Sequence, residues 1–557
     1  MRLTRWAAIA AALALLSFPL VTVAGPFPSA SAAPRVERGT AGGWQLTVRG
    51  KPFLILGGEL GNSSAGTAAQ ADAILPRLAA EHFNTVLMPV AWNEIEPTEG
   101  RFDFSIPDHW IAVARREHLR LILLWFGSWK NAFSSYAPQW VLADAERFPR
   151  AMAADGTATQ ILSVFGAQTL RCDSLAFAAL MRHVRDIDSG EQTVIMVQVE
   201  NEVGYVGIGG RDRSAEANHR FAARVPPQLL RALAQPAVRL PRRLADHFQP
   251  GGGDWGAVFG EAADEAFMAW YYARFSDGIA QAGKRAYPLP IYMNAQLPAP
   301  RERAGDYPSG GPYPFSQPIY RAAAAAIDFY APDIYWPDFE RWVDRYRELG
   351  NPAFVPESRL ELAPYDALYL LGEARGIGFS AFGVDDLPAG GGAAGKPSSD
   401  AAATGPLLAD VYQALSELGD SFLQAQQHGA TRALLLHLTS PRPTRTVSLG
   451  GYLFRATLAR NWRSQQPLTA DGAMLVMQTA PNEFYVLGSG LTVSFLRDPD
   501  VDDRIAGIAD IARLAWNGAW KVAEEMNGDQ SDQGRGLLMD AQAIHLYRVR
   551  LYDYPRR

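Results

Sequence analysis

Short apolar segments recur along residues 53–384, and each one ends at polar or turn-forming residues. Their runs of Val, Ile, Leu and Phe are typical of strands that are buried on both faces, as in a parallel sheet. The pattern predicts eight strands, at 53–58, 85–89, 121–126, 194–199, 290–294, 329–335, 353–356 and 378–384.

Longer amphipathic segments lie between these strands, with apolar positions at helical spacing. We expect helices at 68–82, 107–118, 174–188, 262–283, 337–349 and 364–376. Eight alternating strand–helix units predict an α/β fold, a (β/α)8 or TIM barrel over residues 33–425, with its active site at the carboxyl ends of the strands.

The pattern changes near residue 430, where short alternating runs are separated by turn residues. Such spacing is typical of antiparallel strands, so residues 426–557 are predicted to form a β-sandwich-like domain that supports the barrel or binds glycans. Strands are expected at 433–438, 454–458, 474–478, 484–487, 491–496 and 545–552.

The amino terminus has the order of an export signal. Arg2 and Arg5 precede an apolar core, and Ala30, Ser31 and Ala32 form a small-residue cleavage site. Pro19 interrupts the apolar stretch, which favours a signal peptide (1–32) over a retained anchor. The mature protein is therefore expected in the periplasm or outside the cell, with no membrane association.

Charge and composition exclude several kinds of partner and cofactor. The net charge of −6, with acids and bases interspersed, argues against nucleic acid as a partner. The single cysteine, Cys172, excludes an intramolecular disulfide and a zinc site of several thiolates, and the nine histidines lack metal-binding spacing. No metal or organic cofactor is expected, and no pattern predicts the oligomeric state.

Two predicted strands end in carboxylates. The fourth emerges into Gln198, Glu200, Asn201 and Glu202, and the seventh stops at Glu357. A buried carboxylate costs several kcal/mol unless it is paired or hydrogen-bonded, so acids at strand ends indicate a site. Two carboxyls across one barrel mouth suit glycosidic bond cleavage, which needs a proton donor and a nucleophile or base.

Strand periodicity does not select the acid on the fourth strand. A repeat of two residues places Gln198, Glu200 and Glu202 on one face, so either glutamate fits the pattern.

With these residues in view, the chain resembles glycoside hydrolase family 35, the β-galactosidases, in its bacterial branch with a C-terminal β domain. The resemblance covers about residues 53–386. It rests on the motifs at 92–104 (Trp-Asn-Glu-Ile-Glu-Pro through Phe-Asp-Phe), 197–204 (Val-Gln-Val-Glu-Asn-Glu-Val-Gly) and 354–357 (Phe-Val-Pro-Glu), with support from 57–60 and 125–131.

The resemblance implies a retaining exo-enzyme that removes terminal β-D-galactosyl groups from oligo- or polysaccharides. It makes Glu202 the acid/base and Glu357 the nucleophile, and it gives Asn201 the contact to the sugar 2-hydroxyl. The other residues that it places at the substrate are Glu59, Trp92, Trp125 and Tyr335.

Departures from the family pattern concern the sugar. Ser358 follows the nucleophile where many members have Gly-Trp, and Gly61 stands where bacterial relatives often have His. The alternatives are a related exo-glycosidase, for example for β-L-arabinopyranosides, and a catalytically silent glycan-binding protein.

Long connections after the third, fourth and fifth strands are predicted to wall the mouth, and a Gly/Ala-rich stretch at 389–405 is predicted to be a mobile loop. The aromatic residues expected in that wall are Trp140, Tyr205, Trp255, Tyr307 and Tyr313.

Overall fold

The computed structural model describes residues 33–386, 407–440, 442–461 and 463–556. The predicted export signal at 1–32 and the predicted loop at 389–405 lie outside these residues. Among the described residues, no helix is long and apolar enough to cross a membrane.

All eight predicted barrel strands are confirmed, and they run parallel in one sheet. Their order is β11-β10-β9-β6-β5-β4-β13-β12, and a parallel bridge between Ile334 and Ser358 joins the two edges, so the barrel is nearly closed. The strands are β4 (Ile55–Glu59), β5 (Thr85–Ala91), β6 (Arg120–Lys130), β9 (Val194–Asn201), β10 (Ile291–Gln296), β11 (Phe329–Asp333), β12 (Phe354–Val355) and β13 (Gly378–Phe382).

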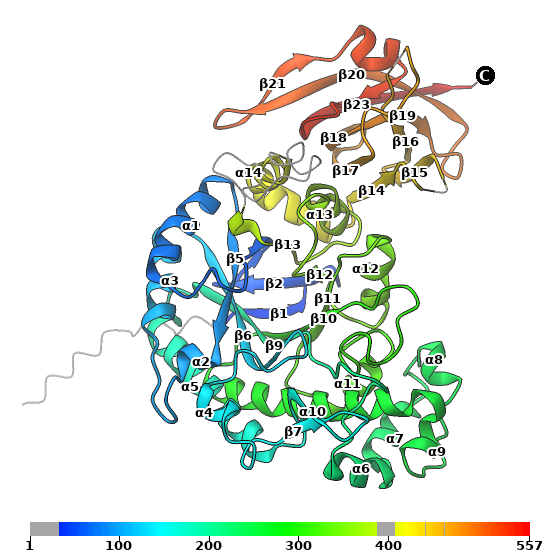
Figure 1. Ribbon diagram of the computed structural model, residues 1–557. Helices are drawn as coiled ribbons and strands as arrows, with labels where there is room; N and C mark the ends of the chain where they lie inside the picture. The colour runs from blue at the N-terminus through cyan, green and yellow to red at the C-terminus, as the bar shows by residue number, and fades with distance from the viewer. Residues whose placement is uncertain (1–32, 387–406, 441, 462, 557) are drawn as a thin grey trace, which may run out of the picture.

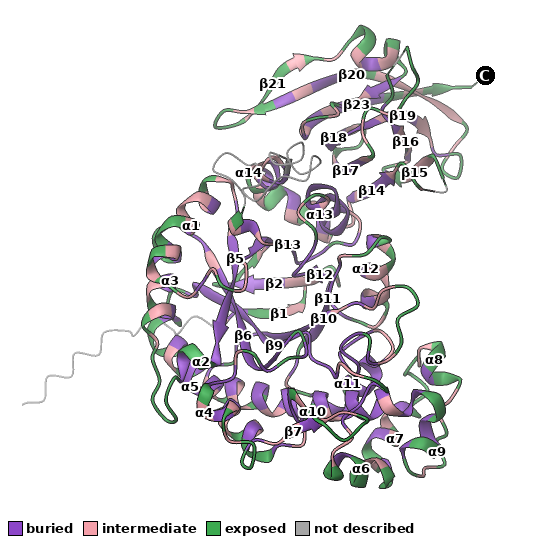
Figure 2. Ribbon diagram, in the orientation of Figure 1, coloured by how far each residue is buried: buried purple, intermediate pink, exposed green. Residues whose placement is uncertain are grey.

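Helices surround this barrel, with their apolar faces against the strands and their polar faces outward (Figure 2). At the first helix, the Thr67 hydroxyl accepts from the Gln70 backbone N–H, which caps the amino terminus. The helices expected from the sequence are α1 (Ala68–Ala80), α3 (Ser105–Arg116), α5 (Ala167–Asp188), α10 (Ala263–Ala286), α12 (Phe339–Glu348) and α13 (Ala363–Gly372).

Additional strands and short helices lie outside the eight strand–helix units of the barrel. The strands β1 (Arg35–Arg38), β2 (Trp44–Val48) and β3 (Lys51–Phe53) form an antiparallel sheet, and Leu46 and Val48 of β2 pack into the interior of the barrel. The long connection after β9 forms helices at the lower right of Figure 1. The short helices and the hairpin are α2 (Trp92–Ile95), α4 (Gln139–Leu142), β7 (Arg150–Met152), β8 (Ala158–Leu162), α6 (Ala215–Ala222), α7 (Pro227–Leu233), α8 (Arg242–Ala245), α9 (Trp255–Phe259) and α11 (Gln317–Ala323).

The C-terminal part is an antiparallel sandwich, which confirms the predicted fold class. A six-stranded sheet, β14-β17-β18-β23-β20-β21, and a four-stranded sheet, β15-β16-β19-β22, share one apolar core. The strands are β14 (Thr431–His437), β15 (Thr444–Leu449), β16 (Tyr452–Leu458), β17 (Asp471–Ala480), β18 (Glu483–Ser489), β19 (Leu491–Arg497), β20 (Arg504–Trp516), β21 (Trp520–Glu525), β22 (Gly536–Leu538) and β23 (His545–Pro555).

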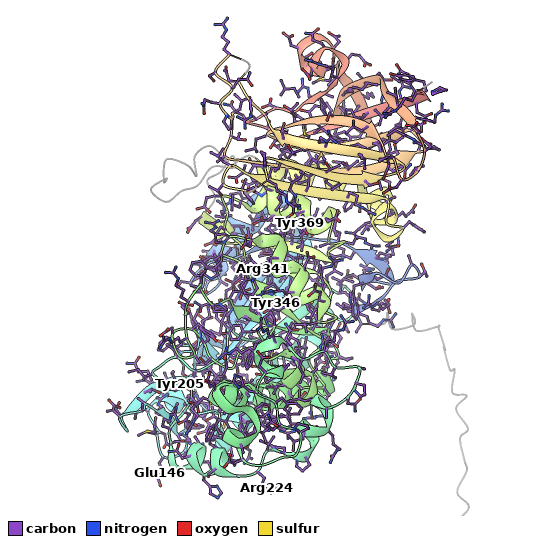
Figure 3. The ribbon with its side chains drawn as sticks, turned by 90° about the vertical axis from the view of Figure 1, so that its right-hand side faces the viewer. Glu146, Tyr205, Arg224, Arg341, Tyr346 and Tyr369 are labelled. Carbon is purple, nitrogen blue, oxygen red and sulfur yellow. The ribbon has the colours of Figure 1, made fainter. Side chains whose placement is uncertain are left out.

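The sandwich stacks on the barrel through α13, which contacts β14 and β17, and through α14 (Leu407–Gln427), which contacts β17 and β18. Figure 3 shows this stacking from the side, with Tyr369 of α13 near the junction. Leu435 and Leu475 of the sandwich belong to the same apolar cluster as the barrel helices, so the two parts share a packed interface.

Candidate active site

The predicted acids Glu202 and Glu357 meet at the carboxyl end of the barrel. Their carboxylate oxygens and that of Asp333 all lie within 4.8 Å of one another. Glu202, Asp333 and Glu357 are 3%, 1% and 4% exposed, so these acids are held in a largely dry site.

The backbone at the end of β9 turns Glu200 away from this cluster. Glu200 and Glu202 have φ angles of +59° and +46°, a left-handed conformation that strands do not adopt. The register between β6 and β9 also shifts after Trp125. The expectation that a two-residue repeat places Gln198, Glu200 and Glu202 on one face is therefore wrong.

Glu200 instead lies between β9 and the outer side of β6. Its carboxylate accepts from the backbone N–H of Ser128 (3.1 Å) and of Trp129 (2.8 Å), and it contacts Asp173 of α5. Burial is the largest cause that raises the pKa of Glu200, followed by the charge of Asp173. Glu200 therefore lies between the barrel strands and α5, outside the mouth of the barrel.

One amide orients the three acids of the mouth. The Oδ1 of Asn294, on β10, accepts from the backbone N–H of Glu202 (2.9 Å), so its Nδ2 must face the other acids. That nitrogen donates to Asp333 Oδ2 (2.8 Å) and to Glu357 Oε1 (3.3 Å). Asn294 thus links the ends of four neighbouring strands.

Further donors hold the two glutamates. The Tyr335 hydroxyl donates to Glu357 Oε2 (2.6 Å). The Asn131 amide donates to Glu202 Oε2, and Lys130 Nζ donates to Asn201 Oδ1 (3.0 Å). The Nδ2 of Asn201 has no hydrogen-bond partner in the described part of the chain, which leaves a buried donor for a ligand.

The electrostatics favour a protonated Glu202. Burial first, and then the charge of Glu357, raise its pKa to about 7, while Lys130 and the hydrogen bonds from Asn131 and Asp333 oppose the rise. A carboxyl with this pKa carries a proton over much of the neutral range, as a general acid requires.

Glu59 belongs to the same cluster. It is completely buried at the end of β4 and lies beside Glu357, Lys130 and Glu202. Burial and the charge of Glu357 raise its pKa well above that of an ordinary glutamate.

Trp92 and Trp125, which the resemblance places at the substrate, lie elsewhere. Trp125 points outward from β6, where its indole N–H donates to Asp173 Oδ1 (2.8 Å) and its ring packs against Phe177 of α5. Trp92 is fully buried, and its indole N–H donates to Glu96 Oε2 (2.8 Å). Both side chains are satisfied core residues, so we do not retain them in the site.

The predicted aromatic wall is also largely internal packing. Trp255 stacks with Phe259 and Phe267 in an apolar core, so its assignment to the wall is wrong. Tyr205 is fully buried. Tyr307 and Tyr313 pack edge to face. The ring of Trp140 packs against those of Trp92 and Phe148.

The sequence reasoning missed Asp333, Asn294, Lys130 and Asn131. The signal that identified Glu202 and Glu357 was available for all four, because each is a polar residue at the carboxyl end of a buried strand.

The acids could also hold a cation. The oxygens of Glu202, Asp333 and Glu357 are close enough together to bind one ion. Oxygen ligands of this kind suit hard divalent cations. The sequence analysis predicts no metal, and Asn294, Tyr335 and Asn131 each donate a hydrogen bond to one of these carboxyls.

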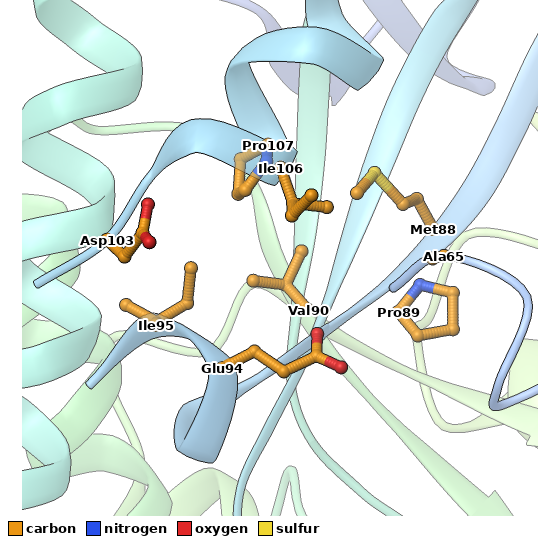
Figure 4. A pocket seen from close by; sticks show the side chains of 9 residues that line it. All are labelled: Ala65, Met88, Pro89, Val90, Glu94, Ile95, Asp103, Ile106 and Pro107. Atoms are coloured by element: carbon orange, nitrogen blue, oxygen red, sulfur yellow. The ribbon is translucent and has the colours of Figure 1, made fainter. Parts of the chain in front are cut away.

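A small cavity between β5, α2 and α3 is separate from the acids (Figure 4). Its volume is about 50 Å³, and Val90 and Glu94 are among its lining residues. Burial raises the pKa of Glu94. A cavity of this size has room for a water molecule or two and not for a sugar.

A barrel with opposed acids at its carboxyl end is the arrangement of a glycosidase, and a family comparison agrees with this class. Residues 66–225 match the β-galactosidase model of glycoside hydrolase family 42, and residues 408–538 match a domain of unknown function, DUF5597. The chain therefore carries a glycoside hydrolase-type barrel followed by a C-terminal domain. The match is to family 42 and not to family 35, and it includes Asn201 and Glu202 but ends before Glu357.

Solved structures with similarity to the chain include three glycosidases. The catalytic domain of a β-amylase from Paenibacillus polymyxa is 11% identical, with a TM-score of 0.43, over 62% of this chain and 95% of that one. A β-mannanase from the blue mussel Mytilus edulis is 12% identical, with a TM-score of 0.40, over 72% and 96%. A cold-adapted β-galactosidase from Rahnella sp. R3 is 15% identical, with a TM-score of 0.43, over 65% and 56%.

These similarities are too distant to contribute to an argument about the activity. No curated protein matches the chain.

Proposed function

We propose that the protein is a retaining exo-glycoside hydrolase that removes terminal β-D-galactosyl groups from oligo- or polysaccharides. The observation that carries the proposal is the separation of the two glutamates, whose nearest carboxylate oxygens lie within 4.8 Å. Retaining enzymes hold their carboxyl groups about 5–5.5 Å apart, whereas inverting enzymes need about 6.5–9.5 Å to admit a water molecule. The family 42 match and the family 35 motifs both support galactose as the sugar.

In this mechanism, Glu357 attacks the anomeric carbon while Glu202 gives its proton to the leaving oxygen. The pKa of about 7 keeps that proton available, and the Tyr335 hydroxyl holds Glu357 in position. The result is a galactosyl ester on Glu357. Glu202, now ionised, removes a proton from water, which then hydrolyses the ester with retained configuration.

The experiment is the release of nitrophenol from aryl β-D-galactoside by the mature protein, compared with Glu357→Gly with and without azide. We expect activity in the parent, loss in the variant and recovery with azide, which occupies the space of the lost carboxylate and yields the α-galactosyl azide. Full activity in Glu357→Gly would contradict the nucleophile assignment. An inactive parent would be tested with other sugars, beginning with β-L-arabinopyranoside, whose ring matches galactose without C6.

We further propose that the enzyme acts outside the cytoplasm after residues 1–32 are removed. Amino-terminal sequencing of protein recovered from the periplasm or the medium tests this. A chain that still begins at Met1 and stays with the cells would contradict it.

A further inference from the structure

Two contacts between acids stand out in the barrel mouth. The carboxyl of Glu59 is within hydrogen-bonding reach of Glu357, and that of Asp333 is within reach of Glu202. Each pair joins a catalytic glutamate of the proposed mechanism to an acid on a different strand, and all four side chains are at most 4% exposed.

The hydrogen-bond donors in the mouth bind atoms other than the oxygens of Glu59 and the Oδ1 of Asp333. The Nδ2 of Asn294 donates to Asp333 Oδ2 and to Glu357 Oε1, and Lys130 donates to Asn201. Within the described residues, no donor reaches either oxygen of Glu59 or the Oδ1 of Asp333. The groups beside these oxygens include the carboxyls of Glu357 and Glu202.

Two ionised carboxylates in contact repel each other strongly when they are shielded from water, so such a pair holds at least one proton. The proton resides on the member whose ionised form receives fewer hydrogen bonds. Glu357 accepts from Tyr335 and Asn294 while Glu59 accepts from neither, so the proton of that pair belongs to Glu59. In the second pair each acid accepts from one amide, Asp333 from Asn294 and Glu202 from Asn131, but the Oδ1 of Asp333 has no donor among the described residues. Burial and the charges of Glu357 and Glu202 also raise the pKa of Asp333 well above the usual range, so the first proton of this pair belongs to Asp333.

We propose that Glu59 and Asp333 are neutral hydrogen-bond donors that position the two catalytic glutamates. This inference rests on the proposed function. Glu59 O–H donates to Glu357 and stabilises it as the ionised nucleophile. Asp333 O–H donates to an oxygen of Glu202, which leaves the proton of Glu202 for the leaving group.

A cation of β6 lies beside these acids. Lys130 lowers the pKa of Glu59 and of Glu202. With Glu59 and Asp333 neutral, the charge of Lys130 faces the ionised Glu357 and the titrating Glu202. The titratable groups that face Glu59 or Asp333 from the surrounding elements are Lys130, Glu202, Tyr292, Tyr335, Tyr346 and Glu357.

The test compares amide and alanine variants of the two acids. Asp333→Asn and Glu59→Gln keep the shape and offer an N–H donor without charge, whereas Asp333→Ala and Glu59→Ala remove the donor. We expect the amide variants to keep kcat on nitrophenyl β-D-galactoside within about fivefold of the parent. The alanine variants should lose about 10- to 100-fold, as for a hydrogen bond to a charged group.

The pH profile separates a neutral Asp333 from an ionised one. If Asp333 is neutral, Asp333→Asn removes no charge, and the alkaline limb of kcat/KM stays in place. If it is ionised, the substitution removes a negative charge beside Glu202, lowers the pKa of Glu202 and moves that limb to lower pH by about one unit. Such a shift, or equal loss in the asparagine and alanine variants, overturns the inference.

Asp366→Asn is the matched control, because Asp366 is a buried acid of α13 outside the mouth. We expect it to leave the activity and its pH profile unchanged. Where an alanine variant fails to fold, infrared difference spectroscopy of the parent against the amide variants takes its place. The C=O stretch of a neutral carboxyl should disappear with Glu59→Gln and with Asp333→Asn, and its absence from the parent overturns the inference.

The azide experiment keeps the two proposals distinct. An inactive Glu357→Gly that azide rescues, together with an asparagine variant as damaged as alanine, would overturn only the role of Asp333. Full activity in Glu357→Gly would overturn both.

Discussion

Glu200 and Glu202 are two residues apart, but they belong to two carboxyl clusters with opposite properties. On the outer side of β6, Glu200 and Asp173 receive the backbone N–H groups of Ser128 and Trp129 and the indole N–H of Trp125. In the mouth, Glu202 lies beside acids of which some oxygens have no hydrogen-bond donor among the described residues.

The two clusters differ in whether their buried oxygens already have hydrogen-bond donors. A buried polar network with nearly every group satisfied stabilises one structure. Unpaired buried groups cost free energy in the empty protein and recover it when a ligand supplies the missing partners. The outer cluster therefore belongs to the architecture, and the inner cluster is suited to binding and chemistry.

Glu202→Gln should produce the largest effect. Removing the acid is expected to lower kcat by at least about 100-fold on galactosides with poor leaving groups, and much less on galactosylation by activated aryl galactosides. Burst kinetics with both kinds of substrate measure this, with Glu200→Gln as the matched control. Equal loss of the first step on both kinds would refute the acid assignment.

Glu200→Ala should instead affect stability. It removes the acceptor of the Trp129 backbone N–H, while the N–H of Ser128 keeps Asp173 Oδ2, with an expected loss of about 2 kcal/mol in the free energy of unfolding. Urea denaturation measures the loss, and kcat per folded molecule should stay near that of the parent. A stable but inactive variant would show that the outer cluster takes part in catalysis.

Tyr335→Phe removes one hydrogen bond to Glu357. We expect a decrease of about tenfold in kcat with little change in stability, because the lost hydrogen bond serves a charged group and Tyr335 itself is only partly buried. Steady-state kinetics and a thermal melt test this. A lower melting temperature with unchanged kcat would assign the hydroxyl to the fold.

The alkaline side of the activity profile should follow Glu202. Its pKa is raised to about 7, so the protonated form is lost as the pH rises through 7, and kcat/KM should fall about tenfold per unit above it. The pKa of the free enzyme from this profile is the measurement. A flat profile up to pH 9 would contradict the assignment.

Asp366 tests whether a missing donor alone marks a functional site. It is buried in α13, its Oδ1 lacks a partner among the described residues, and burial raises its pKa to about 8. The folded protein holds this proton more tightly than the unfolded chain, so stability is full below about pH 4 and falls towards pH 8, by at most about 1.4 kcal/mol per unit for this group.

Asp366→Asn should flatten that fall while kcat stays unchanged. Urea denaturation at pH 5 and pH 8 measures the slope. An unchanged slope would show that Asp366 does not hold the proton, and a loss of activity would extend the functional cluster beyond the mouth.

The sequence alone determined the barrel and both candidate glutamates. Continuous apolar runs identify strands buried on both faces, and Glu202 and Glu357 follow two of those runs directly. Chain order then places both acids at the same end, because all the strands of a (β/α)8 barrel run parallel. These conclusions depend on local pattern and connectivity, which a linear sequence contains.

The tertiary structure decided which polar groups face one another. Positive φ angles at Glu200 and Glu202 reverse the side that each side chain takes, and no strand periodicity encodes them. Trp92 and Trp125 match a family motif but point into the layer between strands and helices. Asp333 and Asn294 join Glu202 and Glu357 from other strands, because barrel closure brings distant strand ends within a few ångströms.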